Sequence, residues 1–522
     1  METESICPEC FQVIPATIHE EDGKVYITKT CQEHGEFSEI YWGDYEEFQR
    51  AQRYERFGRK LDNPRTKVDK GCPHDCGICT EHKSSTVLGI IDVTNSCNLR
   101  CPICFAHAGA AGYLYEPTKE QIRGMMENLL SNSPVWTPAL QLSGGEPTVR
   151  EDLPELVEMA FDLGFVHVEI NTNGIKMAEN VEYCRTLKEA GVSTVYLQFD
   201  GVTPEPYIAA RGFDLLDIKK RAIENLREAD YRSIVLVPVL VKGVNDDQVG
   251  DIIRFAIENK DVIRCINFQP VSITGRINRR EREGMRITIP DLMRLVEEQT
   301  DGLIEKRDWY PVPAAQPLCN FLSVAKNEPF VDFSAHPHCG MATYLFIDGD
   351  QVTPIPDYMD VDKTLETFEK ASERMAEGKE RRAKMQLVMG LIKNVKFKAL
   401  SNYMKSVVLH SDYLSLNRMH HSMILISSMH FMDPYNFDLD RVQRCVIHYA
   451  TPDGRIIPFC TMNTLHREEM ERKFAQPITE ANVTPLYDVF SLTQRIREEG
   501  RDEKSAQKEV EPFQALRARH DF

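Results

Sequence analysis

The sequence of 522 residues lacks long apolar runs, an excess of basic residues and a secretory signal, and each absence argues against a class of protein. No uncharged apolar run reaches the roughly 18 residues that a membrane span needs, so we do not expect a transmembrane protein. The net charge of -18 argues against a nucleic-acid partner, because phosphate binding needs a clustered basic surface. The first residues, from Met1 to Glu4, carry no secretory signal. We therefore expect a cytoplasmic protein, for which contact with a membrane surface stays open.

Cysteine is plentiful. The 15 cysteines cluster at the spacings of metal ligands, which in a reducing compartment indicates metal sites and not disulfides. The length suffices for a catalytic domain and two further modules. We expect a cysteine-rich metal module over 1–85, an α/β domain over 86–285 and a mainly helical, cluster-bearing module over 286–522.

The first metal-ligand pattern lies near the N-terminus. Cys7 and Cys10 form one knuckle, and Cys31 and His34 follow in a second, with an alternating, strand-like stretch between them. Tetrahedral zinc and rubredoxin-like iron sites use the same kind of ligands, so this pattern predicts a mononuclear iron or zinc site without choosing between them.

A second pattern, Cys72-x3-Cys76-x2-Cys79, has the spacing of a cluster loop. We expect these three cysteines to bind metal, and a further iron–sulfur cluster is one way to do so. His74 and His82 lie nearby, and we interpret both as bystanders in preference to ligands.

From about residue 88 to 275 strand and helix patterns alternate, which predicts parallel βαβ units. A capping box at Thr118 and Gln121 begins one of the helices. Six strands are expected, near residues 90–93, 140–142, 166–170, 194–199, 234–241 and 263–268.

Three cysteines follow the first of these strands: Cys97, Cys101 and Cys104. Three thiolates in one loop suit a [4Fe–4S] cluster and leave one iron open to a substrate or cofactor. A structural zinc loop is the alternative.

Polar clusters occur at the ends of the later strands. Gly144, Gly145 and Glu146 form a turn in which the backbone can approach a ligand and a carboxylate or carbonyl can accept from an ammonium group. Candidate ligand contacts at further strand ends are Asn171, Asn173, Gln198 and Asp200, each of which can also be a plain turn residue.

The cysteine loop and the Gly-Gly-Glu-Pro turn together resemble the radical SAM superfamily. The resemblance implies a partial (β/α)6 barrel whose open cluster iron chelates S-adenosylmethionine. It also implies that the turn from Gly144 to Glu146 meets the methionine amino group. Ile103 departs from the family pattern, which usually has an aromatic residue there.

Two features of the C-terminal part remain. The cysteines Cys319, Cys339, Cys445 and Cys460 are candidate ligands of a further cluster. The stretch 384–432 is rich in methionine, and we expect helices that form either a buried core or a channel for a long hydrocarbon. Interleaved lysines there fit either an anionic head group or a solvated face: Lys393, Lys396, Lys398 and Lys405.

Taken whole, the chain resembles the archaeal tetraether lipid synthases and their bacterial relatives within this superfamily. That resemblance implies auxiliary [4Fe–4S] clusters, a mononuclear iron, an external electron donor and a diether phospholipid substrate. The expected reaction is hydrogen abstraction from lipid tails by a 5′-deoxyadenosyl radical, followed by joining of two sp³ carbons.

Two alternatives stay open. A radical SAM methyltransferase on a pterin-like molecule would need a compact pocket with Asn, Asp and Gln contacts in place of an apolar tunnel. A non-catalytic metal-binding or electron-transfer protein would explain the cysteines, but it would leave the turn at Gly144 and the βα units unexplained.

Overall fold

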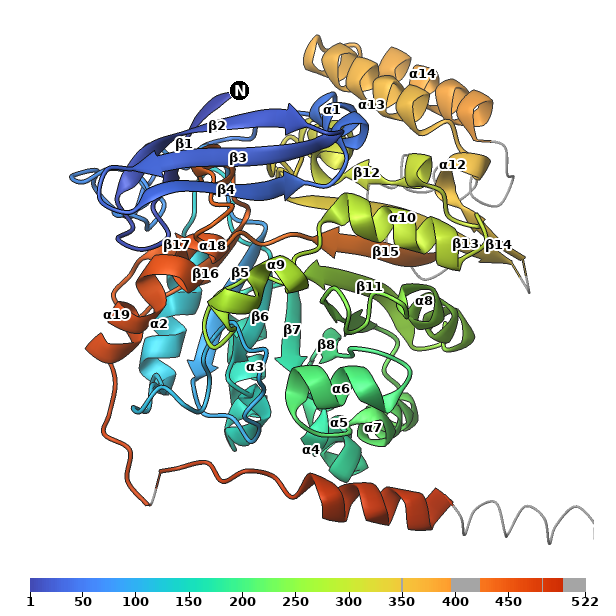
Figure 1. The fold of residues 1–522 in the computed structure, drawn as a ribbon. Coiled ribbons are helices and arrows are strands. Elements are labelled where there is room, and N and C mark those ends of the chain that lie inside the picture. Colours follow the sequence, from blue (N-terminus) through green and yellow to red (C-terminus); the bar gives the residue numbers. More distant parts are fainter. Residues whose placement is uncertain (349–350, 396–422, 481, 501–522) are drawn as a thin grey trace, which may run out of the picture.

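The computed structural model describes residues 1–348, 351–395, 423–480 and 482–500. The N-terminal part is a four-stranded antiparallel sheet that lies at the upper left in Figure 1. Its strands, in order, are β1 (Glu2–Ile6), β2 (Val13–Glu21), β3 (Lys24–Cys31) and β4 (Gly35–Trp42), and helix α1 (Tyr45–Gln52) follows.

The six predicted barrel strands are confirmed, and they lie side by side and parallel in chain order. They are β5 (Leu88–Thr94), β6 (Ala139–Gly144), β7 (His167–Thr172), β8 (Thr194–Gln198), β9 (Ile234–Val237) and β11 (Ile263–Pro270), with the short β10 (Val239–Leu240) pairing with β11. The expected fold class, a radical SAM α/β fold with a cysteine-rich N-terminal module, is therefore confirmed.

Helices connect these strands and cover their outer face (Figure 1). They are α2 (Lys119–Leu130), α3 (Leu153–Leu163), α4 (Ile175–Glu179), α5 (Val181–Glu189), α6 (Pro204–Arg211), α7 (Leu216–Glu228), α8 (Val249–Glu258), α9 (Arg282–Met285) and α10 (Ile289–Gln299). The predicted capping box is present: the Thr118 hydroxyl accepts from the Gln121 amide, and the Gln121 side chain accepts from the Thr118 amide.

Later segments extend the same sheet at both edges. Beside β11 lie β15 (Met423–Met429, parallel to β11), β13 (Gly340–Asp348), β12 (Tyr310–Pro311) and β14 (Gln351–Pro354); beside β5 lie β16 (Ile447–Ala450, parallel to β5) and β17 (Ile456–Pro458). The helical interpretation of residues 423–429 is wrong. This segment is a strand because it pairs on both sides, with β11 and β13, in the middle of a sheet.

The other C-terminal elements are helices. They are α11 (Gln316–Lys326), α12 (Ile355–Tyr358), α13 (Val361–Ala376), α14 (Glu380–Asn394), α17 (Leu439–Gln443), α18 (Phe459–Thr461) and α19 (Arg467–Lys473).

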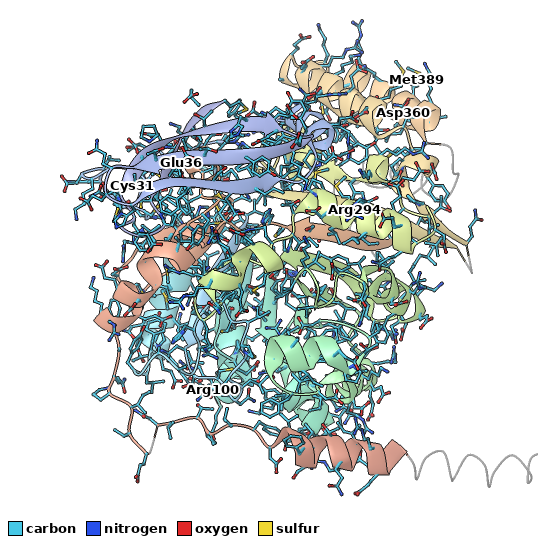
Figure 2. All side chains as sticks on the ribbon, viewed as in Figure 1. Cys31, Glu36, Arg100, Arg294, Asp360 and Met389 are labelled. Atoms are coloured by element: carbon cyan, nitrogen blue, oxygen red, sulfur yellow. The ribbon has the colours of Figure 1, made fainter. Side chains whose placement is uncertain are left out.

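Helix α14 covers the first part of the methionine-rich stretch. Leu387 and Leu391 are buried against α11 and α13, but Met385 and Met389 are 60% and 57% exposed. Met389 lies at the outer edge of the molecule (Figure 2). In the described part of this stretch, these residues therefore either pack against neighbouring helices or face outward. Residues 396–422, with Lys396, Lys398 and Lys405, lie outside the described part of the chain. No helix in the described ranges has both the length and the apolarity that crossing a bilayer requires.

Candidate active site

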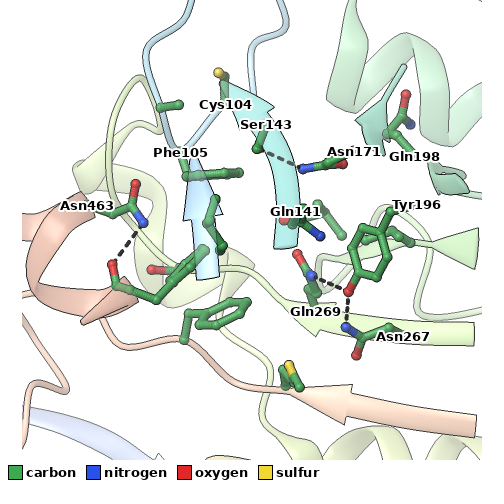
Figure 3. A pocket seen from close by; sticks show the side chains of 18 of the residues that line it. Cys104, Phe105, Gln141, Ser143, Asn171, Tyr196, Gln198, Asn267, Gln269 and Asn463 are labelled. Atoms are coloured by element: carbon green, nitrogen blue, oxygen red, sulfur yellow. Dashed lines mark hydrogen bonds between the residues drawn. The ribbon is translucent and has the colours of Figure 1, made fainter. Parts of the chain in front are cut away.

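A cavity of about 370 Å³ lies inside the barrel (Figure 3). Its lining combines the cysteine loop after β5, the turn after β6 and the inward side chains of the strands. Functional groups of βα barrels gather at the carboxyl ends of the strands, which is where the loop and the turn lie.

Cys97, Cys101 and Cys104 all line this cavity. Among the described residues, one group of three or more His, Cys, Asp or Glu side chains has all its possible metal-binding atoms within 4.8 Å of one another. Cys97, Cys101 and Cys104 do not belong to that group. At least two of their sulfur atoms are therefore more than 4.8 Å apart, which is wider than the ligands of a single metal ion stand. Burial raises the pKa of Cys101, and the nearby guanidinium of Arg211 opposes that rise.

Two glycines hold the turn after β6 against the cysteine loop. Gly144 has φ +130°, and a Cβ there would lie 2.1 Å from the carbonyl oxygen of Thr94. A Cβ on Gly145 would lie 2.1 Å from the carbonyl oxygen of Ser96, the residue before Cys97. The two glycines are thus required for the turn after β6 to pack closely against the backbone of Thr94 and Ser96. This requirement holds whether or not the turn also contacts a ligand.

The carboxylate of Glu146, which also lines the cavity, is occupied by donors of the protein. Its Oε1 accepts from the hydroxyls of Thr148 (2.6 Å) and Thr172 (2.7 Å), and its Oε2 accepts from the amide of Asn173 (2.7 Å). The side chain is buried. Glu146 therefore ties the end of β6 to the end of β7.

Asp200 does not line the cavity. It is fully buried, and its two oxygens accept from Nε and Nη2 of Arg211, both at 2.7 Å. Nη1 of Arg211 donates to the carbonyl oxygen of Ile103 at 2.9 Å, inside the cysteine loop. Arg211 thus lines the cavity beside Cys101 and Cys104, and Asp200 contacts Arg211 from outside the cavity. Sequence reasoning missed Arg211, which no motif marks.

The other predicted contacts do line the cavity: Asn171, Asn173 and Gln198. Lys219, fully buried on α7, donates to Oε1 of Gln198 at 2.7 Å and to the carbonyl oxygen of Asn173. Burial lowers the pKa of Lys219 to about 7, although Asp200 opposes this shift. Lys219 therefore positions two candidate ligand contacts from outside the cavity.

The barrel interior below this rim is also polar, and sequence reasoning did not single it out. Gln141 Nε2 donates to Glu169 Oε1 at 2.7 Å, and Gln269 and Asn267 donate to the hydroxyl of Tyr196, the former at 3.3 Å (Figure 3). All five side chains line the cavity. The signal was present as polar residues at alternate positions of otherwise apolar strands.

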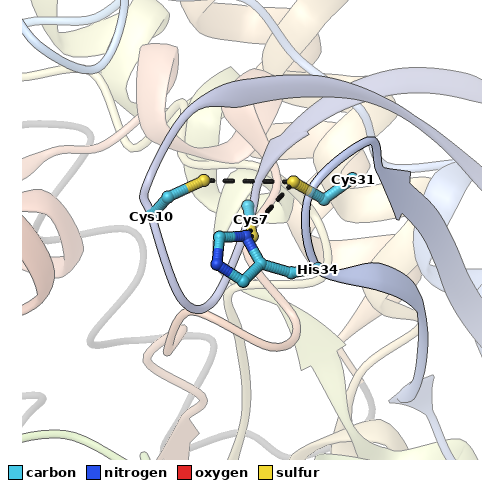
Figure 4. A group of neighbouring side chains, drawn as sticks. All are labelled: Cys7, Cys10, Cys31 and His34. Carbon is cyan, nitrogen blue, oxygen red and sulfur yellow. Dashed lines mark hydrogen bonds between the residues drawn. The ribbon is translucent and has the colours of Figure 1, made fainter.

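The two predicted knuckles meet in the structure, where Cys7, Cys10, Cys31 and His34 lie together (Figure 4). Nδ1 of His34 lies 3.6 Å from Sγ of Cys7 and 3.5 Å from Sγ of Cys31, and Sγ of Cys10 lies 3.9 Å from Sγ of Cys31. A tetrahedral zinc ion has ligand atoms about 3.5–3.8 Å apart. The residues present therefore fit a mononuclear Cys₃His site.

Changing His34 to Ala should weaken metal binding at this site by at least about a hundredfold, because even outer-shell partners of a metal ligand are worth 10–100-fold. Zinc retained in competition with a chelator measures the effect, and iron bound elsewhere in the chain should not change. His19→Ala, which removes a half-exposed histidine of the same sheet, is the matched control. Equal zinc retention in both variants would rule His34 out as a ligand.

Six of the remaining cysteines form two further groups. Cys72, Cys76 and Cys79 line a small cavity with His82. His82 Nε2 lies 2.9 Å from the carbonyl oxygen of Cys445, and burial lowers its pKa to about 4.

Cys339, Cys445 and Cys460 line another cavity, of about 60 Å³, with Arg441 and His430. Nε of Arg441 donates to Sγ of Cys339 at 3.4 Å. The fourth predicted C-terminal ligand, Cys319, does not line that cavity; it is buried on α11, near Asp332 and Arg59.

Comparison with known proteins agrees with this arrangement. The radical SAM superfamily matches residues 91–256, and the family described as HMPTM N-terminal zinc ribbon domain matches residues 1–43. The chain is 52% identical over 493 residues to a 7,8-dihydro-6-hydroxymethylpterin dimethyltransferase of Methanocaldococcus jannaschii. The aligned stretch covers 92% of this chain and 96% of that protein. It is 27% identical over 238 residues to a GTP 3′,8-cyclase of Peptoclostridium acidaminophilum, covering 43% of this chain and 69% of that protein.

Among solved structures, SuiB of Streptococcus suis bound to its precursor peptide SuiA matches with a TM-score of 0.34 and 19% identity, over 42% of this chain and 46% of that one.

These findings correct one expectation. Superfamily membership is confirmed, and with it a [4Fe–4S] cluster and S-adenosylmethionine as cofactors and a further metal at the ribbon. The assignment to the tetraether lipid synthases is wrong, because the relative that aligns over nearly the whole chain is a pterin dimethyltransferase. The chain belongs to the radical SAM superfamily and, within it, to the family of the 7,8-dihydro-6-hydroxymethylpterin dimethyltransferase.

Proposed function

We propose that this radical SAM enzyme methylates a reduced pterin at carbon. The observation that carries the proposal is the 370 Å³ cavity, which joins the cysteine loop to a polar barrel interior. A pterin is a small heterocycle edged with hydrogen-bond donors and acceptors, so it needs amide, hydroxyl and carboxylate partners in a confined space. The full-length relative, named for activity on 7,8-dihydro-6-hydroxymethylpterin, supports the same substrate class.

The predicted joining of lipid tails and the predicted diether phospholipid partner are wrong. The near-full-length relative acts on a pterin. The physical reason agrees, since a hydrocarbon tail would bring no donor to the buried carboxylate of Glu169, and a buried polar group left short of partners costs about 1–3 kcal/mol.

The cofactors supply the radical chemistry of the proposed reaction, and the protein positions the reactants. The [4Fe–4S] cluster, when bound by Cys97, Cys101 and Cys104, supplies the electron that splits S-adenosylmethionine and gives a 5′-deoxyadenosyl radical able to attack unactivated C–H bonds. The chain's own residues hold the reactants in place and exclude water from the buried site. Arg211 keeps a positive charge beside the cluster thiolates, and Lys219 fixes Gln198 and the backbone at Asn173.

We also propose auxiliary iron–sulfur clusters at the two further cysteine groups. The set of Cys339, Cys445 and Cys460 is supported by a shared cavity with room for several atoms. His430 lines the same cavity; it is 1% exposed, and neither ring nitrogen has a hydrogen-bond partner within the described ranges, which makes it a candidate fourth ligand. The set of Cys72, Cys76 and Cys79 is supported by its spacing. The domain boundaries expected at residues 85 and 285 stay predictions.

Deuterium transfer tests the proposed substrate without knowledge of the methyl donor. Iron-reconstituted protein is incubated anaerobically with S-adenosylmethionine, a reductant and 7,8-dihydro-6-hydroxymethylpterin deuterated at its sp³ carbons. We expect 5′-deoxyadenosine that carries deuterium, detected by mass spectrometry. Formation of 5′-deoxyadenosine without deuterium, under conditions where the pterin is in excess, would overturn the pterin as the substrate.

A further inference from the structure

We propose that Glu169, oriented by Gln141, recognises the amino and N3–H groups of a pterin, so that the pyrimidine ring enters the barrel first. The inference rests on the proposed function and assigns a binding residue and an orientation to it.

The position of Glu169 follows from the alternation of β7. Val168 and Ile170 are fully buried among the core residues that face the covering helices, whereas Glu169 and Asn171 line the cavity. The register pairs Glu169 with Gln141 of β6, whose Nε2 donates to Oε1 at 2.7 Å. Burial raises the pKa of Cys265 on β11 to about 12, and the charge of Glu169 adds to that rise, as expected if the carboxylate faces the interior.

Glu169 is a buried carboxylate with few partners. The residue is 8% exposed, and besides Gln141 its nearest donor is Nε2 of His167, 3.6 Å from Oε2. Among the described residues that line the cavity, Arg211 is the only arginine or lysine, and it already pairs with Asp200. A carboxylate has about four acceptor positions, so donors are lacking here.

A ligand with two parallel N–H groups would supply the missing donors. Burial of an ionised carboxylate costs several kcal/mol unless it is paired or hydrogen-bonded, and a bidentate pair is the strongest compensation. The 2-amino-4-oxopyrimidine ring of a pterin presents such a pair, its N3–H and its 2-amino group. A 2,4-dioxo ring, as in a lumazine, keeps N3–H but presents an oxygen where the pterin has the amino group, and that oxygen would face the carboxylate.

This orientation of the pterin directs the carbons that react toward the cysteine loop. Cys97, Cys101 and Cys104 lie in the loop that follows the carboxyl end of β5, whereas Glu169 is the third residue of β7, nearer its amino end. With the pyrimidine ring at Glu169, the opposite side of the bicycle points toward the cysteine loop. That side carries the 6-hydroxymethyl group and the saturated carbon 7, the sp³ carbons of the dihydropterin.

A substitution that inverts the hydrogen-bond pattern tests the inference. In Glu169→Gln the amide can donate to a 2-oxo group and accept from N3–H, so it suits the lumazine. We expect wild-type enzyme to prefer 7,8-dihydro-6-hydroxymethylpterin over the corresponding lumazine by about 10- to 100-fold in kcat/KM, as for other bidentate base-edge contacts. Glu169→Gln should reverse that preference. Deuterium transfer into 5′-deoxyadenosine provides the rate.

The outcomes separate this inference from the proposed function. If wild-type enzyme turns over the pterin but Glu169→Gln keeps the wild-type preference, Glu169 does not read this edge, and the proposed function stands. Equal use of pterin and lumazine by wild-type enzyme would overturn the inference by the same logic. No deuterium transfer from either compound would overturn the proposed function itself.

Two further variants protect the test against misfolding. Glu169→Asp keeps a carboxylate, so it should keep the pterin preference with a raised KM. A change of preference in Glu169→Gln that came only from a disturbed fold would appear in Glu169→Asp as well. Glu155→Gln makes the same chemical change on the surface of α3, where the side chain is 65% exposed, and should leave both rates unchanged. Iron content confirms that each variant is loaded with its clusters.

Discussion

Replacement of Cys97 by Ala should lower the formation of 5′-deoxyadenosine at least about a thousandfold. Cys97 is one of three thiols that line the cavity at the cysteine loop, and a [4Fe–4S] cluster with only two protein ligands there would be lost or misplaced. No other group in the cavity can supply the electron for S-adenosylmethionine cleavage, so the whole catalytic advantage depends on the cluster. Iron content, cluster absorbance and 5′-deoxyadenosine measured together test this expectation.

Cys184→Ala is the matched control. Cys184 is a fully buried thiol on α5 whose Sγ contacts the carbonyl oxygens of Met177 and Asn180, both at 3.6 Å. Its truncation should cost about 1 kcal/mol of stability and leave cleavage intact. If Cys97→Ala kept both its iron and its cleavage rate, Cys97 would not be a cluster ligand.

Replacement of Asp200 by Ala should destabilise the folded protein by about 3–5 kcal/mol, because it leaves the guanidinium of Arg211 buried without its counter-charge. Both side chains are buried, and two bonds of 2.7 Å join them. Arg211 also donates to Ile103 in the cysteine loop, so the loss should disturb the cluster as well. A lower midpoint of anaerobic thermal unfolding, together with reduced iron content, is the expected result.

A surface pair provides the comparison. Asp251→Ala breaks an ion pair with Arg254 in which both side chains are about half exposed, and exposed pairs are worth less than about 1 kcal/mol. The double variant Asp200→Leu/Arg211→Met removes both buried charges and should recover most of the lost stability, but not the cleavage rate if the charge of Arg211 acts on the cluster. A midpoint for Asp200→Ala equal to that of Asp251→Ala would show that the buried pair contributes nothing.

Much of the fold was predictable because its signals are local. The six barrel strands are short apolar runs bounded by turn residues, and the helix after Thr118 has its capping box. The strand Met423–Met429 was mistaken for a helix because a short apolar run has no unique period. Only the edge of the sheet beside β11, which is built from distant parts of the chain, makes it a strand.

The candidate site was predictable to a different degree for each residue. The cysteine loop and the Gly144–Gly145 turn carry their chemistry in their spacing. Glu146 was chosen as part of the Gly-Gly-Glu-Pro motif and Asp200 for its position at a strand end, but the structure shows both carboxylates occupied by protein donors. Arg211 lies in no motif, and only its contacts mark it.

The sequence by itself determined that this is a metal-dependent radical SAM protein with a βα barrel, because ligand spacing and strand patterns are local properties of the chain. Only the tertiary structure decided which side chains share a cavity. The proposed substrate class rests on the inward faces of strands that are far apart in the chain, such as those of Gln141 and Ser427, and such a surface exists only after the strands have paired. A methionine-rich stretch therefore pointed to a lipid, whereas the folded barrel presents amides, a hydroxyl and a carboxylate to its ligand.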